Sequence, residues 1–158
     1  MNNFTHPFEP LIWDDSQILI LGTFPSIVSF EQSFYYAHPR NQFWKILSAI
    51  YDMPADTQEE RIKILAEKKL ALWDVIASCT RANSSDTNLK DIIPNDFETF
   101  LSKYPIKKLL FTGRKAESIF EKYFSHLNIK RERLPSPSPA YAAMKFEEKL
   151  TIYKSLLS

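Results

Sequence analysis

The stretch Ile18-Leu19-Ile20-Leu21-Gly22 decides the fold, because it is a short apolar run without helical period that stops at a glycine. Such a run predicts a β-strand. Leu70-Ala71-Leu72-Trp73-Asp74-Val75 reads as a second strand, and Lys108 to Thr112 as a third that Gly113 ends. A weaker run from Ile129 to Leu134 predicts a fourth strand.

Apolar residues at helical spacing separate these strands and predict helices between them. Strand and helix alternate along the chain, which predicts a parallel sheet covered by helices on both faces, an α/β fold. We expect one domain over residues 1–158, since this length suits a single core. The predicted helices run from Asn41 to about Tyr51, from Thr57 to Lys68, from Pro94-Asn95 with Asn95 as cap, from Arg114 to Phe124, and from about Lys145.

The composition is that of a folded protein, with 44% hydrophobic, 25% charged and 14% aromatic residues. The single cysteine, Cys79, excludes an internal disulfide, an iron–sulfur cluster and a zinc site built from cysteines. Three histidines without HExxH spacing make metal chemistry unexpected. We therefore predict a site without metal or cofactor. The chain has no bilayer-length apolar run and no signal-peptide pattern, so we expect a cytoplasmic location.

The net charge of +1 hides a polarity along the chain. Residues 1–100 carry 8 Lys and Arg against 14 Asp and Glu, which is net −6, and residues 101–158 carry 12 against 5, which is net +7. Such asymmetry is one indication of an anionic partner. On charge alone, solvated helix faces are the favoured explanation.

Several unusual loops follow the carboxyl ends of predicted strands, where open α/β sheets bind their ligands. These loops should therefore meet at one edge of the sheet, which is the candidate site. The chain has no GxGxxG, GxxxxGK[ST] or GxSxG motif, so the usual marks of dinucleotide binding, P-loop chemistry and the hydrolase elbow are absent. The loops are Gly22 to Ser26, Ile76 to Asn88, Gly113 to Lys115 and Leu134 to Pro139.

Four separated blocks resemble the uracil-DNA glycosylase superfamily, most closely its DNA-deoxyinosine (hypoxanthine-DNA) glycosylases, which are related to the mismatch-specific uracil/thymine branch. The most specific block is Tyr35-Tyr-Ala-His-Pro-Arg-Asn-Gln-Phe-Trp44. The resemblance implies a three-layer α/β/α fold whose four parallel strands lie in the order 2-1-3-4. It also implies a monomer that acts on damaged double-stranded DNA, with single-stranded DNA left open. The other blocks are Leu21 to Ser26, Leu72 to Val75 with Arg81, and Leu134 to Ala140.

The resemblance assigns the catalytic role to Asn41. The mismatch-specific branch positions its attacking water with an asparagine in the first block, where this chain has Phe24. The deoxyinosine glycosylases share that departure and use the asparagine of the HPxNxFW block. An amide oxygen suits this role, because it accepts a hydrogen bond from water and has no proton to lose. By propensity alone, Asn41 is equally a cap for the helix that starts there.

Further residues are expected to bind the extruded base, because a base inside a duplex is out of reach. Tyr36 matches the aromatic that stacks on it, with core packing as the alternative. Arg81 and Asp86 either fix the pocket or read the base edge; Asp86 as a general base or as a turn residue stays open. Asp74 is expected to tie down its strand end. The other expected base-binding residues are Gly22, Thr23, Phe24, Tyr35 and His38.

The loop Pro135 to Pro139 is the expected DNA wedge, because a rigid apolar loop can fill the gap left by a flipped nucleotide. A polyproline spacer is the alternative. Two departures from the family pattern, Ser33-Phe34 in place of a glycine and Pro137 in the last block, leave Asn41 unaffected. The expected DNA-binding residues are Pro135, Ser136, Pro137 and Ser138, supported by Arg114, Lys115 and Lys145.

The sequence thus predicts a monofunctional DNA glycosylase that hydrolyses the N-glycosidic bond of deoxyinosine and leaves an abasic site during base excision repair. Two alternatives stay open. One is excision of uracil opposite guanine, against which Phe24 argues. The other is a catalytically silent member that only binds DNA or a nucleoside.

Overall fold

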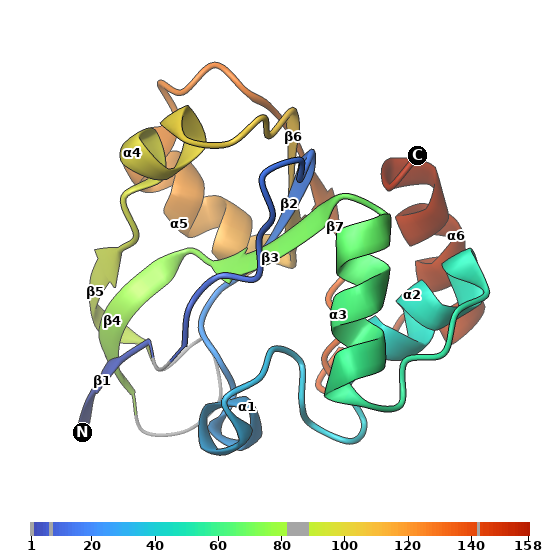
Figure 1. Cartoon of the computed structure of the whole chain (residues 1–158). Helices are drawn as coiled ribbons and strands as arrows, with labels where there is room; N and C mark the ends of the chain where they lie inside the picture. Colours follow the sequence, from blue (N-terminus) through green and yellow to red (C-terminus); the bar gives the residue numbers. More distant parts are fainter. Residues whose placement is uncertain (1, 7, 82–88, 142) are drawn as a thin grey trace.

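The computed structural model describes residues 2–6, 8–81, 89–141 and 143–158. Its centre is a sheet of four parallel strands in the order β3-β2-β6-β7 (Figure 1). In chain order this is 2-1-3-4, so the predicted topology is confirmed. The strands are β2 (Ile18–Gly22), β3 (Leu70–Asp74), β6 (Lys108–Thr112) and β7 (Lys130–Leu134).

Helices cover both faces of this sheet and bury two cores (Figure 1). Leu19 and Leu21 of β2 point into one core, while Ile20 between them points into the other, as the alternation of a strand requires. The three-layer α/β/α prediction is therefore confirmed. The first core packs against α4 (Phe97–Ser102) and α5 (Arg114–Phe124), the second against α2 (Phe43–Tyr51), α3 (Gln58–Glu67) and α6 (Phe146–Leu156).

Local sequence explains where these helices begin and end. The Thr57 hydroxyl accepts the backbone N–H of Glu60, and the Glu60 carboxylate accepts the N–H of Thr57, which forms a capping box for α3. Helix α2 ends at Asp52 in a left-handed conformation. Helix α5 follows Gly113, whose φ of 126° favours glycine. Among the described residues, no helix combines the length and apolarity needed to cross a membrane.

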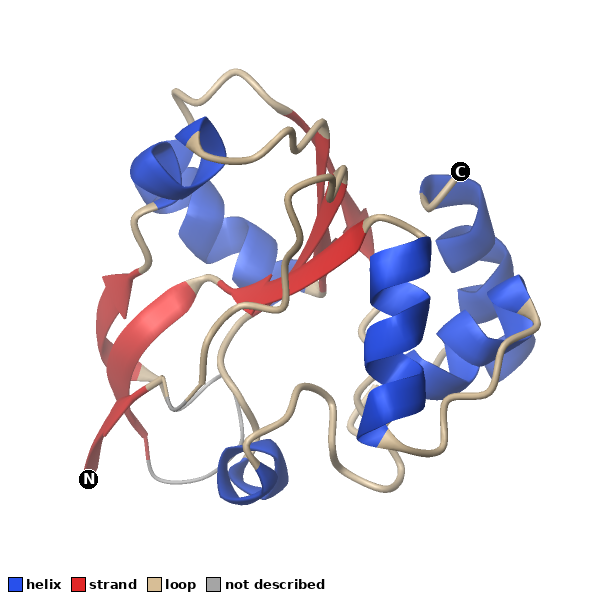
Figure 2. Cartoon of the chain, in the orientation of Figure 1, coloured by secondary structure: helices blue, strands red, loops and turns tan. Residues whose placement is uncertain are grey.

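A second, antiparallel sheet lies beside the first, in the order β1-β4-β5 (Figure 2). Its strands are β1 (Asn2–Thr5), β4 (Ile76–Arg81) and β5 (Lys90–Pro94). The sequence predicted a loop from Ile76 to Asn88. Its first part, Ile76 to Arg81, forms strand β4 instead, so that part of the prediction was wrong. The strand β4 carries a mixed pattern, and its stabilising partners lie at the N-terminus and after residue 89, which local periodicity does not reveal.

Two further predictions need correction. Asp96, not Asn95, caps α4, since its carboxylate accepts the backbone N–H of Thr99. The Asn95 amide instead donates to the backbone carbonyl of Asp74 at 2.8 Å. The first predicted helix begins at Asn41, but a short helix, α1 (Ile27–Gln32), precedes it and is capped by Ser26.

Candidate active site

A cavity of about 740 Å³ opens at the carboxyl edge of the four-stranded sheet, and we call it the edge cavity. The last residues of three adjacent strands, Gly22, Asp74 and Thr112, line it together with the loops that follow. The predicted meeting of loops at this edge is thus observed for the loops after β2 and β7. The lining consists of Gly22, Thr23, Phe24, Pro25, Ser26, Val28, Ser29, Tyr35, Tyr36, His38, Asn41, Asp74, Thr112, Ser136, Pro137, Ser138, Pro139, Ala140 and Tyr141.

Asn41 lies in the wall of the edge cavity immediately before α2. Its Oδ1 accepts the backbone N–H of Phe43 at 2.9 Å, so the side chain satisfies a donor at the first turn of the helix. An amide oxygen has two lone pairs, and one is left for another donor. The N-cap residue of α2 is Gln42, which makes no side-chain cap bond of its own, so the Asn41 oxygen caps the helix from the preceding position. Capping and a contact with a bound molecule are therefore compatible in one side chain.

Tyr36 is half-buried in the same wall and adopts a φ of 54°. Its ring stacks on Phe43 with centroids 4.1 Å apart and an interplanar angle of 20°. Burial, and to a lesser degree the charge of Asp74, raises the pKa of the Tyr36 phenol, which therefore stays protonated. Because one ring face lies on Phe43, the opposite face is the one available to a planar ligand.

Three side-chain oxygens surround the α-carbon of Gly22 at the floor of the cavity. A β-carbon at this position would stand 2.6 Å from Asp74 Oδ1, 3.2 Å from Tyr36 Oη and 3.4 Å from Thr112 Oγ1. The Tyr36 and Thr112 hydroxyls lie 3.0 Å apart, and Thr112 also donates to the backbone carbonyl of Leu21 at 3.4 Å. Glycine is thus required by close approach, because any side chain would displace the Asp74 carboxylate.

Asp74 also contacts the N-terminal segment. Its Oδ2 lies 2.8 Å from Nε2 of His6, and both side chains are only 6% exposed. The other ring nitrogen of His6, Nδ1, lies 2.8 Å from the backbone carbonyl oxygen of Phe8. The contact joins the segment after β1 to the end of β3.

The wall beside this pair is aromatic. Tyr35 is 3% exposed, donates its hydroxyl to the carbonyl of Glu9 at 3.2 Å, and packs edge-on against Phe8 with centroids 4.6 Å apart. Burial first, and the charge of Asp74 second, raises the pKa of the Tyr35 phenol. Tyr35 therefore forms a neutral, well-packed wall.

The loop from Pro135 to Pro139 closes the cavity on the side of α6. The backbone N–H of Gln42 donates to the carbonyl of Pro137 at 2.9 Å, and the Tyr153 hydroxyl donates to the carbonyl of Pro135 at 2.7 Å. The Ser136 hydroxyl accepts the N–H of Ser138. This loop is therefore attached both to the residue after Asn41 and to the last helix.

The family model of the Uracil DNA glycosylase superfamily matches residues 10–157 of the chain, which include the loops of the edge cavity and the four-stranded sheet. The chain belongs to the uracil DNA glycosylase superfamily. Its fold is similar to that in the solution NMR structure of a uracil DNA glycosylase candidate from Methanosarcina acetivorans. The TM-score is 0.79 and the sequence identity 28%, and the match covers 95% of this chain and 94% of that one.

Two curated relatives carry the name hypoxanthine DNA glycosylase. The protein from Methanosarcina barkeri is 37% identical over 112 residues, which are 69% of this chain and 71% of the relative. The protein from Methanosarcina acetivorans is 33% identical over 136 residues, which are 84% of this chain and 85% of the relative. These relatives and the superfamily support a DNA glycosylase role, which makes DNA the substrate of this hydrolase.

Most base-binding residues predicted for this glycosylase do line the edge cavity: Gly22, Thr23, Phe24, Tyr35, Tyr36 and His38. His38 is half-buried, and its Nδ1 accepts the backbone N–H of Arg40 at 3.1 Å. Asp86 lies outside the described residues. The described part of the chain holds no group of three or more His, Cys, Asp or Glu side chains placed to bind a metal ion.

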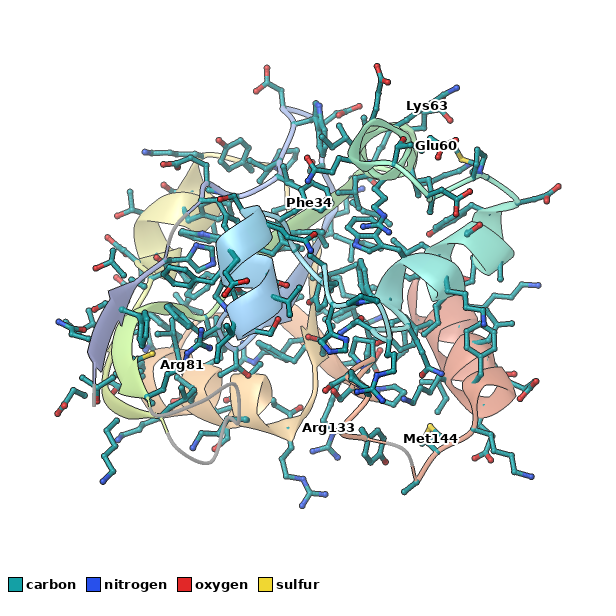
Figure 3. The ribbon with its side chains drawn as sticks, turned by 90° about the horizontal axis from the view of Figure 1, so that it is seen from below. Phe34, Glu60, Lys63, Arg81, Arg133 and Met144 are labelled. Carbon is teal, nitrogen blue, oxygen red and sulfur yellow. The ribbon has the colours of Figure 1, made fainter. Side chains whose placement is uncertain are left out.

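Arg81 lies behind the cavity wall of the glycosylase, not in its lining. Its guanidinium stands over the rings of Phe4 and Phe24 at 5.2 and 5.1 Å and donates to the carbonyl of Pro25. Figure 3 shows Arg81 on the side of α1 and the smaller sheet, far from Met144 on the side of α6. Arg81 was predicted either to fix the pocket or to read the base edge, and these contacts fit the first of the two roles.

The predicted basic residues occupy two places. Arg114 and Lys115 are exposed at the start of α5 and do not line the edge cavity. Lys145 is exposed and borders a hollow of about 410 Å³, which we call the side hollow and which shares Ser138, Pro139 and Tyr141 with the edge cavity. The side hollow is lined by Arg40, Gln42, Ser138, Pro139, Tyr141, Met144, Lys145, Phe146 and Lys149.

Sequence reasoning missed Lys149, which is 2% exposed on α6. Its ammonium donates to Gln42 Oε1 at 2.8 Å and to the carbonyl of Tyr141 at 3.0 Å, and it forms no ion pair with a described residue. Burial lowers the pKa of the Lys149 ammonium. The only sequence signal was its position in the apolar stripe of α6, four residues before Tyr153.

Proposed function

We propose that the protein is a monofunctional DNA-deoxyinosine glycosylase, which removes hypoxanthine from DNA and leaves an abasic site. The observation that carries the proposal is the position of Asn41, which lines the edge cavity together with the stacked Tyr36. Phe24 occupies the place of the first-block asparagine and is 8% exposed in the same wall. The Methanosarcina relatives named hypoxanthine DNA glycosylase support this choice of base.

The reaction begins with extrusion of the damaged nucleotide into the edge cavity. The base stacks on the Tyr36 ring face opposite Phe43, a type of contact worth about 1–3 kcal/mol. The loop from Pro135 to Pro139 then occupies the gap in the duplex. Because Gln42 holds Pro137, the wedge and the Asn41 segment keep a fixed relation to each other.

Hydrolysis breaks the bond between C1′ of the sugar and the base, and the sugar acquires positive charge as the bond lengthens. The free lone pair of Asn41 Oδ1 accepts a hydrogen bond from the attacking water and orients its oxygen toward C1′. The water oxygen bonds to C1′ and releases a proton, and the base leaves with the bond electrons and gains a proton. Among the described residues that line the edge cavity none is a lysine, which fits hydrolysis without a lyase step.

The test is a comparison of duplexes that contain either deoxyinosine or deoxyuridine, with abasic sites counted after alkaline cleavage. We expect strand breaks at deoxyinosine. Release of uracil with inert deoxyinosine would overturn the choice of base, and inertness toward both would leave a DNA-binding member without catalysis.

A further inference from the structure

A buried lysine ammonium lines the side hollow, and the hydrolysis described above makes no use of it. Lys149 is 2% exposed and belongs to the lining of this hollow but not to that of the edge cavity. Ser138, Pro139 and Tyr141 line both spaces, so their segment forms the wall between them. Met144, also in the lining of the side hollow, is labelled in Figure 3 on the side of α6.

The ammonium of Lys149 has one donor to spare. Of its three N–H groups, one donates to Gln42 Oε1 at 2.8 Å and one to the carbonyl of Tyr141 at 3.0 Å. The third has no acceptor among the described residues, and no Asp or Glu belongs to the described lining of the hollow. Burying a cation without a carboxylate partner is costly, and a bound anion would offset that cost.

Other positive charges surround the same space. Arg40 and Lys145 are exposed and line the side hollow from two segments that are far apart in the sequence. The Lys45 ammonium lies 5.0 Å from the ring centre of Phe146, which is also a lining residue. The hollow therefore attracts an anion from solution before the buried ammonium contacts it.

Helix α6 begins at the side hollow and leaves backbone donors free there. Its N-cap, Lys145, makes no side-chain cap bond. The N–H groups of Glu148 and Lys149 donate to the Lys145 carbonyl, whereas those of Phe146 and Glu147 have no acceptor among the described residues. The carboxylates of Glu147 and Glu148 are exposed and do not line the hollow. Free N–H groups and the positive end of the helix dipole add to the preference for an anion.

We propose that the side hollow binds a backbone phosphate of the DNA strand whose extruded nucleotide enters the edge cavity. The proposal rests on the proposed function. A phosphodiester is the anion that DNA supplies, and its two unbridged oxygens accept the free N–H of Lys149 and those at the start of α6. Because one segment separates the two spaces, a strand with a nucleotide in the edge cavity continues past Ser138 and Pro139 into the side hollow.

Gln42 connects this phosphate site to the segment that carries Asn41. The side-chain oxygen of Gln42 accepts from Lys149, and its backbone N–H donates to the carbonyl of Pro137. Asn41 is the preceding residue. A phosphate in the hollow is thus held against the residue that follows the proposed water ligand, which fixes the DNA strand relative to the edge cavity.

The test places one neutral linkage at a time in the DNA. Each duplex carries 2′-fluoro-deoxyinosine, whose fluorine disfavours positive charge on the sugar and so prevents cleavage. A methylphosphonate replaces each of the neighbouring phosphates in turn, and fluorescence anisotropy gives the Kd. In the wild type we expect one of these linkages to raise the Kd by about three- to tenfold through the loss of its contact with Lys149.

Lys149→Met should remove the effect of that linkage alone. We expect the variant to bind the unmodified duplex severalfold more weakly and to show a penalty of about twofold or less at the linkage in question, because its partner charge is gone. The penalties at the other linkages should stay as they are. Lys154→Met, exposed on the same helix, is the matched control and should keep the wild-type pattern. Arg40→Met changes an exposed residue of the hollow, so it repeats the test without disturbing the core.

The same penalties at every linkage in the wild type, Lys149→Met and Arg40→Met would overturn the proposal. Inorganic phosphate that competes with DNA at constant ionic strength only when Lys149 is present, without any linkage effect that depends on Lys149, would also overturn it, because the hollow would then bind a free anion.

The phosphate site and the proposed function can fail separately. If the wild type leaves deoxyinosine in DNA intact but one linkage effect depends on Lys149, the proposed function fails and the phosphate site stands. If deoxyinosine is excised and no linkage effect depends on Lys149, the proposed function stands and the phosphate site fails.

Discussion

The side-chain oxygen of Asn41 lies 2.9 Å from the backbone nitrogen of Phe43, so the proposed catalytic amide is also the polar group that closes the first turn of α2. The helix orients the amide, and the amide in turn stabilises the helix. A loss of activity on mutation of Asn41 therefore has two explanations, a lost cap or a lost water ligand. Variants chosen for their capping ability separate them.

Asn41→Ser keeps a good cap but is too short to replace the amide, whereas Asn41→Ala removes both functions. We expect Asn41→Ala to lower the free energy of unfolding by about 1 kcal/mol and Asn41→Ser to change it by a few tenths. Both should lower the excision rate by about a hundred- to a thousandfold, because both remove the water ligand. Urea unfolding and single-turnover kinetics provide the two readouts; full activity in Asn41→Ser would remove the amide from the mechanism.

Gly22→Ala tests the floor of the edge cavity. The added β-carbon would stand 2.6 Å from Asp74 Oδ1, so the carboxylate must move or the strand end must shift. We expect a loss of about 1–3 kcal/mol in stability and at least a tenfold loss of kcat/KM. Thr57→Ala, at a residue that caps α3 and lines neither cavity, is the comparison for a purely local loss of stability. If Gly22→Ala excised deoxyinosine at the wild-type rate, the three oxygens would have no role in binding.

Three of the parallel strands, β2, β3 and β6, were predictable because each is a short apolar run that ends at a turn residue or polar loop, and Ile20 alternates between cores with Leu19 and Leu21. The fourth, β7, has the mostly charged sequence Lys-Arg-Glu-Arg-Leu and gave a weaker signal. Strand β4 was not predictable from the sequence, because its stability comes from pairing with β1 and β5 and not from its own pattern of apolar residues. Tyr36 and Asn41 were predicted from the resemblance of their sequence block alone, and both line the edge cavity.

His6 and Lys149 escaped prediction for a physical reason. Each acts through a partner far away in the sequence, Asp74 for His6 and Gln42 for Lys149. A single histidine gives no local sign of burial, and the only local sign for Lys149 is its position in the apolar stripe of α6. Asp74 was expected to tie down its strand end. Its backbone carbonyl does so by accepting a hydrogen bond from Asn95, while its carboxylate contacts His6.

Lys149→Met should weaken DNA binding without unfolding the protein. The ammonium donates to Gln42 Oε1 and to the Tyr141 carbonyl, so replacing it by an apolar side chain of similar length removes the donor of both bonds and should lower the free energy of unfolding by about 1–3 kcal/mol. The side hollow, however, loses one of the positive charges around Ser138 and Pro139, so the Kd for DNA should rise severalfold. Lys154→Met on the exposed side of α6 is the control. A higher Kd for Lys154→Met than for Lys149→Met would contradict this role.

The buried tyrosines predict how stability depends on alkaline pH. Burial raises the pKa of Tyr35, Tyr36 and Tyr153 above the ordinary value of 10.0, so between that pH and the folded-state pKa the unfolded chain has released protons that the folded protein still holds. The unfolded state then binds fewer protons, and the free energy of unfolding falls by about 1.4 kcal/mol per pH unit for each such tyrosine.

Tyr153→Phe removes one of these groups together with its hydrogen bond to the Pro135 carbonyl. At pH 7 we expect it to lose about 1 kcal/mol of stability through that bond. Above pH 10 its stability should decline less steeply than that of the wild type by about 1.4 kcal/mol per pH unit, so the two curves converge. Urea titrations from pH 7 to pH 11 measure both effects, and parallel alkaline slopes would show that Tyr153 ionises equally in the folded and unfolded chain.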